Sequence, residues 1–514
     1  MSVLALRMRP VPSRATIVAT AATGSTLILG ALATHKWGLG GLLLLLIVVV
    51  VAILLLRPLV MVTLVIALTI ACEASVFGLF TFTYALYGSI TKDLTILDAL
   101  VGLAVLSVAL DMMRHRRRLR VPGPLRLFLL FLALAMVGSA VMSHATGTSV
   151  HFAILSEHTL AYLLVLPTAV ANLRIDKQQL RYLLVGAMGI AIVKALLGIV
   201  EVVTGHGAIV EGSGRLTYYE PTANWVIMMG LFSVLAALVI RAKPSLWLLI
   251  GGAVLFGSLL LSYRRSFWIA AVVGIALILL VGMTPAGRRL LLPVVLSMVA
   301  GVWVLSTVPF QASGQIVKRA TSLTSSKVEA NKYDRYRIDE RINVLANIRE
   351  HPITGLGIDT PWKAIVRPLS IESAGQGGYG AYVHFAVLWY WVKLGVVGLL
   401  AYLSLLAGTA VLAWRVWRRS EDSVLRVFGL ASLCGIAGLV VAETTASFTG
   451  TDPRMSLIVA AQAGLLALAA RMNQASSIDL FSSMASGPSN SGGEAATARV
   501  LNATCASRAS PRPQ

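Results

Sequence analysis

Five arginines and one histidine stand where polar intervals interrupt long hydrophobic runs, and an asparagine follows the first of these arginines. They are Arg215, Asn224, Arg264, Arg265, Arg337, Arg341 and His384. A guanidinium group stays charged and binds phosphate oxygens through a fork of N–H groups. A histidine that titrates near neutral pH can accept a proton from a reacting hydroxyl. Together these residue types predict chemistry on a phosphate-bearing substrate.

The longest polar interval, from Tyr333 to Trp391, begins with a predicted amphipathic helix. Its apolar face is expected to contain Ile338, Ile342, Leu345 and Ile348, with Arg337, Glu340 and Arg341 on other faces. Pro352 should end the helix because it has no backbone N–H to donate, and Gly355 and Gly357 are typical of the turn that follows. A glycine-rich stretch at 375–380 then leads to His384 and indicates a loop that closes over a substrate.

Each of these residues also has a purely structural interpretation. Arg215, and Arg264 with Arg265, could extend from the ends of spans to lipid headgroups. The helix at 333–352 could lie on the membrane surface with its charges in water. His384 could be structural. On spacing alone, both interpretations stay open.

The elements that must position these residues are membrane spans. Of the 514 residues, 57% are hydrophobic and 13% are charged, and a soluble protein of this size could not bury so much apolar surface. Apolar runs of about 16–22 residues predict an all-α, polytopic transmembrane bundle of about 12–14 spans. The net charge of +21 does not indicate nucleic acid, because the basic residues cluster in short loops.

The predicted spans are residues 17–34, 41–56, 58–77, 94–112, 127–143, 159–173, 182–203, 222–240, 245–262, 266–283, 290–308, 385–414, 427–447 and 455–470. The run 385–414 is too long for one straight span at about 1.5 Å per residue. We expect it either to begin as a re-entrant or surface helix before Gly395 or to form two short spans.

Basic loops predict the orientation of the spans. Arg114–Arg120 is the strongest cytoplasmic anchor, and alternation puts four more basic loops on the same side: 174–181, 241–243, 288–289 and 415–419. The loops 204–221, 263–265, 309–384 and 448–454 then lie outside. The candidate arginines therefore sit against the positive-inside trend, which indicates that they are retained for chemistry.

We divide the chain into a transmembrane bundle, residues 1–470, and a disordered cytoplasmic tail, residues 471–514. The bundle includes an extracytoplasmic catalytic loop at 309–384. No motif with metal-ligand spacing occurs, so we expect neither a metal nor another cofactor. The three cysteines are scattered and predict no disulfide framework.

Taken in order, these motifs resemble the O-antigen ligase and O-antigen polymerase family over roughly residues 205–415. Arg215 through Asn224 is similar to that family's arginine followed by Pro-Asn before a span, with two extra residues between Pro221 and Asn224. The turn at 262–266 is similar to its Ser-Arg-small turn, with Arg265 aligned.

The most specific match is Arg337, fifteen residues before Pro352, followed by the turn that ends at Gly357. His384 with Phe385 is similar to the family's His-Asn pair, with phenylalanine in place of asparagine.

The resemblance implies a glycosyltransferase that moves a glycan from a polyprenyl-diphosphate carrier to an acceptor hydroxyl at the outer face of the bacterial inner membrane, without a metal. The acceptor would be a lipid A–core sugar of lipopolysaccharide in a ligase, or a lipid-linked repeat unit in a polymerase. Arg215, Arg265 and Arg337 would hold the diphosphate, and His384 would orient or deprotonate the acceptor. His384 and Arg337 are the expected catalytic residues, and Arg264, Arg341 and Asn224 are further substrate-binding candidates.

The alternative function is a membrane transporter of an anionic or lipid-linked sugar. Arginines on the outer side could line an anion path, and Lys194 lies well inside a predicted span, where a charge indicates function. Against transport, the sequence has no repeated halves and no paired broken helices.

Overall fold

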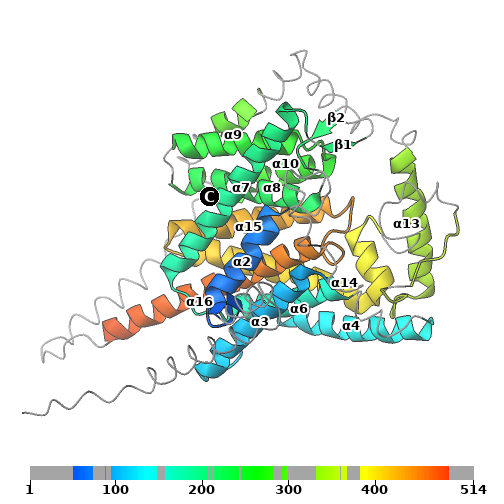
Figure 1. Cartoon of the computed structure of the whole chain (residues 1–514), viewed down its shortest axis with the longest axis horizontal. Coiled ribbons are helices and arrows are strands. Elements are labelled where there is room, and N and C mark those ends of the chain that lie inside the picture. Colours follow the sequence, from blue (N-terminus) through cyan, green and yellow to red (C-terminus); the bar gives the residue numbers. More distant parts are fainter. Residues whose placement is uncertain are drawn as a thin grey trace, which may run out of the picture.

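The computed structural model describes residues 50–51, 53–72, 87, 94–147, 157–206, 208–210, 214–218, 220–241, 245–281, 292–298, 300, 332–358, 360–366 and 383–485. The helices are α2 (Pro58–Ala71), α3 (Ile96–Arg114), η2 (Gly123–Leu125), α4 (Arg126–Ala145), α6 (His158–Ala171), α7 (Lys177–Val203), α8 (Pro221–Arg241), α9 (Leu246–Leu260), α10 (Arg265–Val281), α13 (Lys332–Glu350), α14 (Ala386–Arg419), α15 (Ser423–Ala442) and α16 (Pro453–Ala485). The strands in this part of the chain, β1 (Ala208–Val210) and β2 (Gly214–Leu216), pair antiparallel. The predicted all-α bundle is confirmed (Figure 1).

Seven helices within the described ranges are long and apolar enough to cross a membrane: α3, η2 continued by α4, α7, α8, α14, α15 and α16. α2, α6, α9 and α10 are shorter apolar helices of the same bundle. Each predicted span between residues 58 and 283, and each between 385 and 470, coincides with one of these helices. The predicted spans 17–34 and, for the most part, 41–56 and 290–308 lie outside the described residues.

The last helix is longer than the sequence predicted. The disordered tail was expected from residue 471, whereas α16 continues to Ala485. The extra stretch contains neither proline nor glycine, the residues that most disfavour a helix interior. Residues 486–514, the rest of the expected tail, lie outside the described residues.

The helix ends gather into two groups, and one of them is basic. Arg117 Nη1 donates to the backbone oxygen of Asn172, and the backbone N–H of Arg120 donates to its side chain, both at 3.1 Å. Arg181 pairs with Asp422 at 3.5 Å. Three loops that we expected in the cytoplasm therefore meet at this basic end.

The opposite end, here called the outer end, joins loops expected outside the cytoplasm. Thr159 donates to the Gly450 carbonyl at 2.6 Å, and the Ala386 N–H donates to the Glu443 carbonyl at 3.1 Å. α13 lies across this end, beside the first part of α14 (Figure 1). The grouping of loops agrees with the orientation predicted from charge.

α14 is interrupted at Gly395, which adopts φ 68° and ψ −168°. The sequence predicted that the 385–414 run could not be one straight span, and this break confirms it. A break inside a helix leaves backbone groups without their usual partners four residues away. In an apolar environment each such group must find another partner.

The turn after α13 supplies those partners. Leu356 N–H donates to Val392 O at 2.8 Å, Gly357 N–H to Lys393 O at 3.0 Å, and Val396 N–H to the Ile353 carbonyl at 3.2 Å. The motif that follows Pro352 therefore has a structural role, because it completes the hydrogen bonding of a broken helix.

Close packing explains the glycines at this contact. A Cβ on Gly395 would lie 2.0 Å from the Ile353 oxygen, and one on Gly355 would lie 2.5 Å from the Gly395 nitrogen. Both residues also have φ values of +68°, which side chains disfavour.

The predicted apolar face of α13 is partly wrong. Ile348 is buried, but Ile338 and Ile342 are 46% and 47% exposed. The buried face instead carries Tyr336, Glu340, Asn343, Val344, Asn347 and Ile348. Its polar members are buried because each hydrogen-bonds a neighbouring segment, which offsets the cost of removing them from water.

We predict that Gly395→Ala destabilises the protein by at least about 3 kcal/mol, because it combines left-handed strain with a backbone clash. Thermal unfolding in detergent micelles measures the loss. The matched control is Gly189→Ala in α7, where a Cβ meets nothing within 4 Å. Equal unfolding temperatures for Gly395→Ala and the parent would contradict the described docking.

Candidate active site

His384 lies in the turn before α14, against the buried face of α13. Its backbone N–H donates to Glu340 Oε2 at 2.9 Å, and its Nδ1 lies 3.1 Å from each oxygen of that carboxylate. Tyr336 meets the imidazole edge-on, with ring centroids 5.7 Å apart. The Glu340 side chain is fully buried, whereas 18% of the His384 side chain is exposed. The histidine is therefore held by several contacts while part of its side chain stays exposed.

The two arginines predicted on α13 differ in exposure. Arg337 is half-buried and directly follows Tyr336, the residue that contacts the His384 ring. Arg341 is exposed. The structure therefore brings the helix that carries Arg337 against the turn of His384, and the catalytic roles of both residues stay predictions.

Two asparagines hold α13 in this position. Asn343 Oδ1 accepts from the Ile365 and Val366 N–H groups, both at 2.7 Å. Asn347 Oδ1 accepts from Lys363 N–H at 3.0 Å, and its Nδ2 donates to the Lys363 carbonyl at 2.8 Å. Sequence reasoning missed them, although they continue the face of Glu340 at spacings of three and four residues.

Arg215 and the pair Arg264–Arg265 come from neighbouring segments. β2 carries Arg215, and the next residues pack on the turn between α9 and α10, where Thr217 N–H donates to Leu261 O at 3.2 Å. Tyr263 has a left-handed φ of 50°, which reverses the chain so that α10 begins at Arg265. Arg215 is exposed, and both arginines of the turn are half-buried.

The loop from Glu443 to Asp452 connects the start of α10 to the turn that carries the histidine. Phe448 stacks on Phe267, two residues after Arg265, with centroids 5.8 Å apart. The neighbouring Ser447 donates to the carbonyl of Val383, directly before His384. One short loop therefore contacts both the start of α10 and the turn that carries the histidine.

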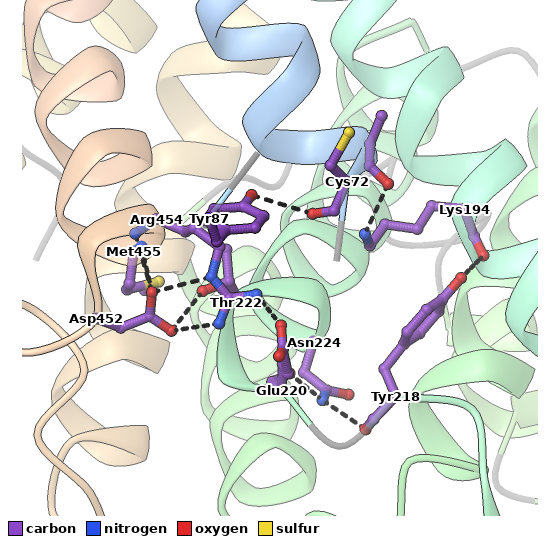
Figure 2. Close-up of polar contacts among 11 residues, drawn as sticks. Cys72, Tyr87, Lys194, Tyr218, Glu220, Thr222, Asn224, Asp452, Arg454 and Met455 are labelled. Carbon is purple, nitrogen blue, oxygen red and sulfur yellow. Dashed lines mark hydrogen bonds and ion pairs between the residues drawn. The ribbon is translucent and has the colours of Figure 1, made fainter. Parts of the chain in front are cut away.

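A buried ion cluster ties the same loop to the start of α8 (Figure 2). The Arg454 guanidinium bonds Glu220, and its Nη2 lies 3.0 Å from Asp452 Oδ2. Thr222 donates to that oxygen at 3.1 Å. Asp452 also caps α16, because its Oδ1 accepts the Arg454 N–H at 2.9 Å. Sequence reasoning missed this cluster, although Asp-Pro is typical of a helix start.

Asn224 lies one turn inside α8 and has no exposed surface. Its Nδ2 donates to the carbonyls of Tyr218 and Glu220, at 3.2 and 2.8 Å. These bonds hold the turn between the Arg215 hairpin and α8 (Figure 2). A contact of Asn224 with substrate stays a prediction.

Lys194, the charge that favoured a transporter, is buried in α7. Its Nζ lies 3.5 Å from the Ala71 carbonyl and 5.1 Å from the centroid of the Tyr218 ring. Tyr218 in turn donates to the Lys194 carbonyl at 2.7 Å (Figure 2). These contacts connect α2, α7 and the approach to α8 and give the lysine a structural explanation.

An apolar cavity of about 180 Å³ runs between α2, α7, α8, α15 and α16. Trp225 and Ala237 line its two ends along α8, a distance of about 18 Å at 1.5 Å per residue. Ile70, Leu183 and Ile458 line other walls. The cavity therefore follows α8 for several turns and is lined mainly by apolar side chains.

Arg454→Met should destabilise the protein by about 3–5 kcal/mol, because it leaves the buried Glu220 and the half-buried Asp452 without their cation. Unfolding temperature in detergent measures the effect. Arg349→Met, at an exposed position of α13, is the control and should be neutral. A stable Arg454→Met protein would mean that the carboxylates do not depend on this guanidinium.

Burial raises the pKa of Glu443, in the loop after α15, from 4.5 to about 7. The folded protein therefore binds this proton more tightly than the unfolded chain. The resulting stability is fully present below pH 4.5 and is lost as the pH rises through about 7. This contribution to the free energy of unfolding amounts to about 3 kcal/mol.

Glu443→Gln should flatten the pH dependence of unfolding, whereas Glu421→Gln, at an exposed site, should not. An unchanged profile for Glu443→Gln would refute the assignment.

Comparison with known proteins identifies one part of this architecture. Residues 250–403 match the family model described as O-Antigen ligase. The match includes Arg265, Arg337 and His384 together with the break at Gly395. The chain matches no curated protein. Residues 250–403 are therefore similar to the O-antigen ligase family, within a chain whose described part has seven helices long and apolar enough to cross a membrane.

Proposed function

We propose that this protein transfers a glycan from a polyprenyl-diphosphate carrier to an acceptor hydroxyl at the outer face of a bacterial inner membrane. The observation that carries the proposal is the loop 443–452. It contacts both the start of α10, where Arg265 lies, and the turn that carries His384. A diphosphate held by arginines would therefore lie near a histidine that can act on an acceptor.

The proposed reaction is a substitution at the anomeric carbon of the donor sugar. The acceptor oxygen forms a bond to that carbon while the bond to the diphosphate oxygen breaks, and the diphosphate leaves with the electron pair. The acceptor proton passes to His384. Arg215, Arg265 and Arg337 stabilise the negative charge that grows on the leaving group. Stabilisation of this charge by fixed groups is usually the largest single term in enzyme catalysis. Arg264 and Arg341 are second candidates for the same role.

The lipid part of the donor has a suitable environment in the bundle. The cavity between α2, α7, α8, α15 and α16 is apolar along about 18 Å of α8. Trp225, at the outer end of the cavity, directly follows Asn224 in α8. The Asn224 side chain bonds the carbonyl of Tyr218, which lies just after the hairpin of Arg215. A polyprenyl chain in this cavity would therefore leave its diphosphate at the level of the arginines.

Both acceptor types of the family fit this scheme, and the surface glycan of a strain that lacks the protein distinguishes them. Single repeat units on the final acceptor would indicate a polymerase. Long chains left on the polyprenyl lipid would indicate a ligase.

Alanine substitution of Arg215, Arg265, Arg337 or His384 should each lower glycan transfer at least about 100-fold, since each removes charge stabilisation or proton transfer. Arg337→Lys should also be poor, because an ammonium cannot bind two oxygens with a fork of donors. Initial rates in membrane vesicles with isotopically labelled lipid-linked glycan measure the effect. Arg349→Ala, exposed on the same helix, should retain full activity. Full activity after replacement of both Arg337 and His384 would end the proposal.

A further inference from the structure

We infer that Glu340 is a positioning residue that sets the tautomer and orientation of His384. The inference rests on the proposed function, in which His384 accepts the proton of the acceptor hydroxyl. Glu340 is buried in α13, and every hydrogen bond described for its carboxylate is made with His384.

The contact determines which ring nitrogen carries the proton. Both Glu340 oxygens lie 3.1 Å from His384 Nδ1. An ionised carboxylate only accepts hydrogen bonds, so Nδ1 must be the donor. In the neutral imidazole the basic lone pair is then on Nε2, the nitrogen directed away from Glu340. Glu340 therefore prepares the imidazole as a base at Nε2.

The same carboxylate also fixes the backbone that carries the ring. The His384 N–H donates to Glu340 Oε2 at 2.9 Å, so one side chain holds both ends of the residue. Tyr336 closes one side of the ring edge-on, with an interplanar angle of 76°. Because the backbone N–H and Nδ1 of His384 are both bound and Tyr336 blocks one side of the ring, the imidazole has few other orientations. A base already held in one orientation favours catalysis, because little freedom is lost when the reaction begins.

The arrangement depends on α13 being docked. Asn343 and Asn347 bind the segment 363–366, and the turn at Ile353–Gly357 binds the broken helix α14. Both attachments set the distance between Glu340 and His384, because the two residues come from different elements. The orientation of His384 is therefore set by Glu340, a residue 44 positions earlier in the chain.

Two substitutions of Glu340 separate positioning from stability. Glu340→Gln keeps the shape but removes the charge, and its amide N–H₂ can donate to Nδ1 and so reverse the tautomer. Glu340→Asp keeps the charge but is one methylene shorter, which leaves a small cavity and lowers stability. His384→Ala tests the proposed function alongside them. Glu350→Gln, the exposed last residue of α13, is the matched control.

The assay uses membrane vesicles of the source cell that lack the native protein and carry their own labelled polyprenyl-diphosphate glycan. We expect Glu340→Gln to lower kcat about 100-fold with an unchanged KM for acceptor, and Glu340→Asp to stay within about tenfold of the parent. Unfolding temperatures should follow the opposite order, with Glu340→Asp the less stable variant. Glu350→Gln should match the parent in both measurements.

The outcomes separate the two levels of the argument. An inactive His384→Ala with a fully active Glu340→Gln would overturn the positioning role and leave the proposed function intact. A fully active His384→Ala would overturn both. Rates that follow unfolding temperature, or a Glu340→Gln protein that does not accumulate in the membrane, would assign Glu340 a structural role only and overturn the inference.

Discussion

The hydrogen bonds across the break in α14 are the interaction on which the outer end depends. A backbone group left without a partner in an apolar environment costs several kcal/mol, and the break at Gly395 exposes three at once. The turn Ile353–Gly357 satisfies them from outside the helix. It can approach closely enough only because glycines stand on both sides of the contact. The motif therefore joins α13 to α14, and with it Glu340 to His384.

The second interaction that holds the outer end is the ion cluster at the end of the 443–452 loop. Arg454 is buried between Glu220 and Asp452, where removal of the guanidinium would leave two carboxylates without their cation. The cluster attaches the start of α8 to the start of α16. The 443–452 loop, which leads into α16, also contacts α10 and the turn that carries His384. Segments more than 200 residues apart are thereby held at one level of the bundle.

α13 differs from an ordinary amphipathic helix because its buried face is hydrogen-bonded and not simply apolar. Ile338 and Ile342 face outward, while Glu340, Asn343 and Asn347 face inward. Hydrophobic periodicity alone predicts the opposite, since it assigns burial by apolarity. The inward polar residues are tolerated because each is bonded to a neighbouring segment, and directional bonds of this kind define one orientation of the helix.

The amino-acid sequence determined the all-α membrane bundle, the helix positions described within residues 58–283 and 385–470, the interruption near Gly395 and the grouping of basic loops. These follow from local patterns, namely the length of apolar runs, glycine and proline positions, and the distribution of arginine. It also singled out Arg265 and Arg337, because arginines against the topological trend are visible without a structure, and His384, because it follows a glycine-rich stretch. Only the tertiary structure decided which face of α13 is buried, that Glu340 holds His384, and that Arg454 ties the 443–452 loop to α8. Those contacts join residues that are 44 to 234 positions apart, and such pairs leave no periodic signal in one sequence because their partners are chosen by packing.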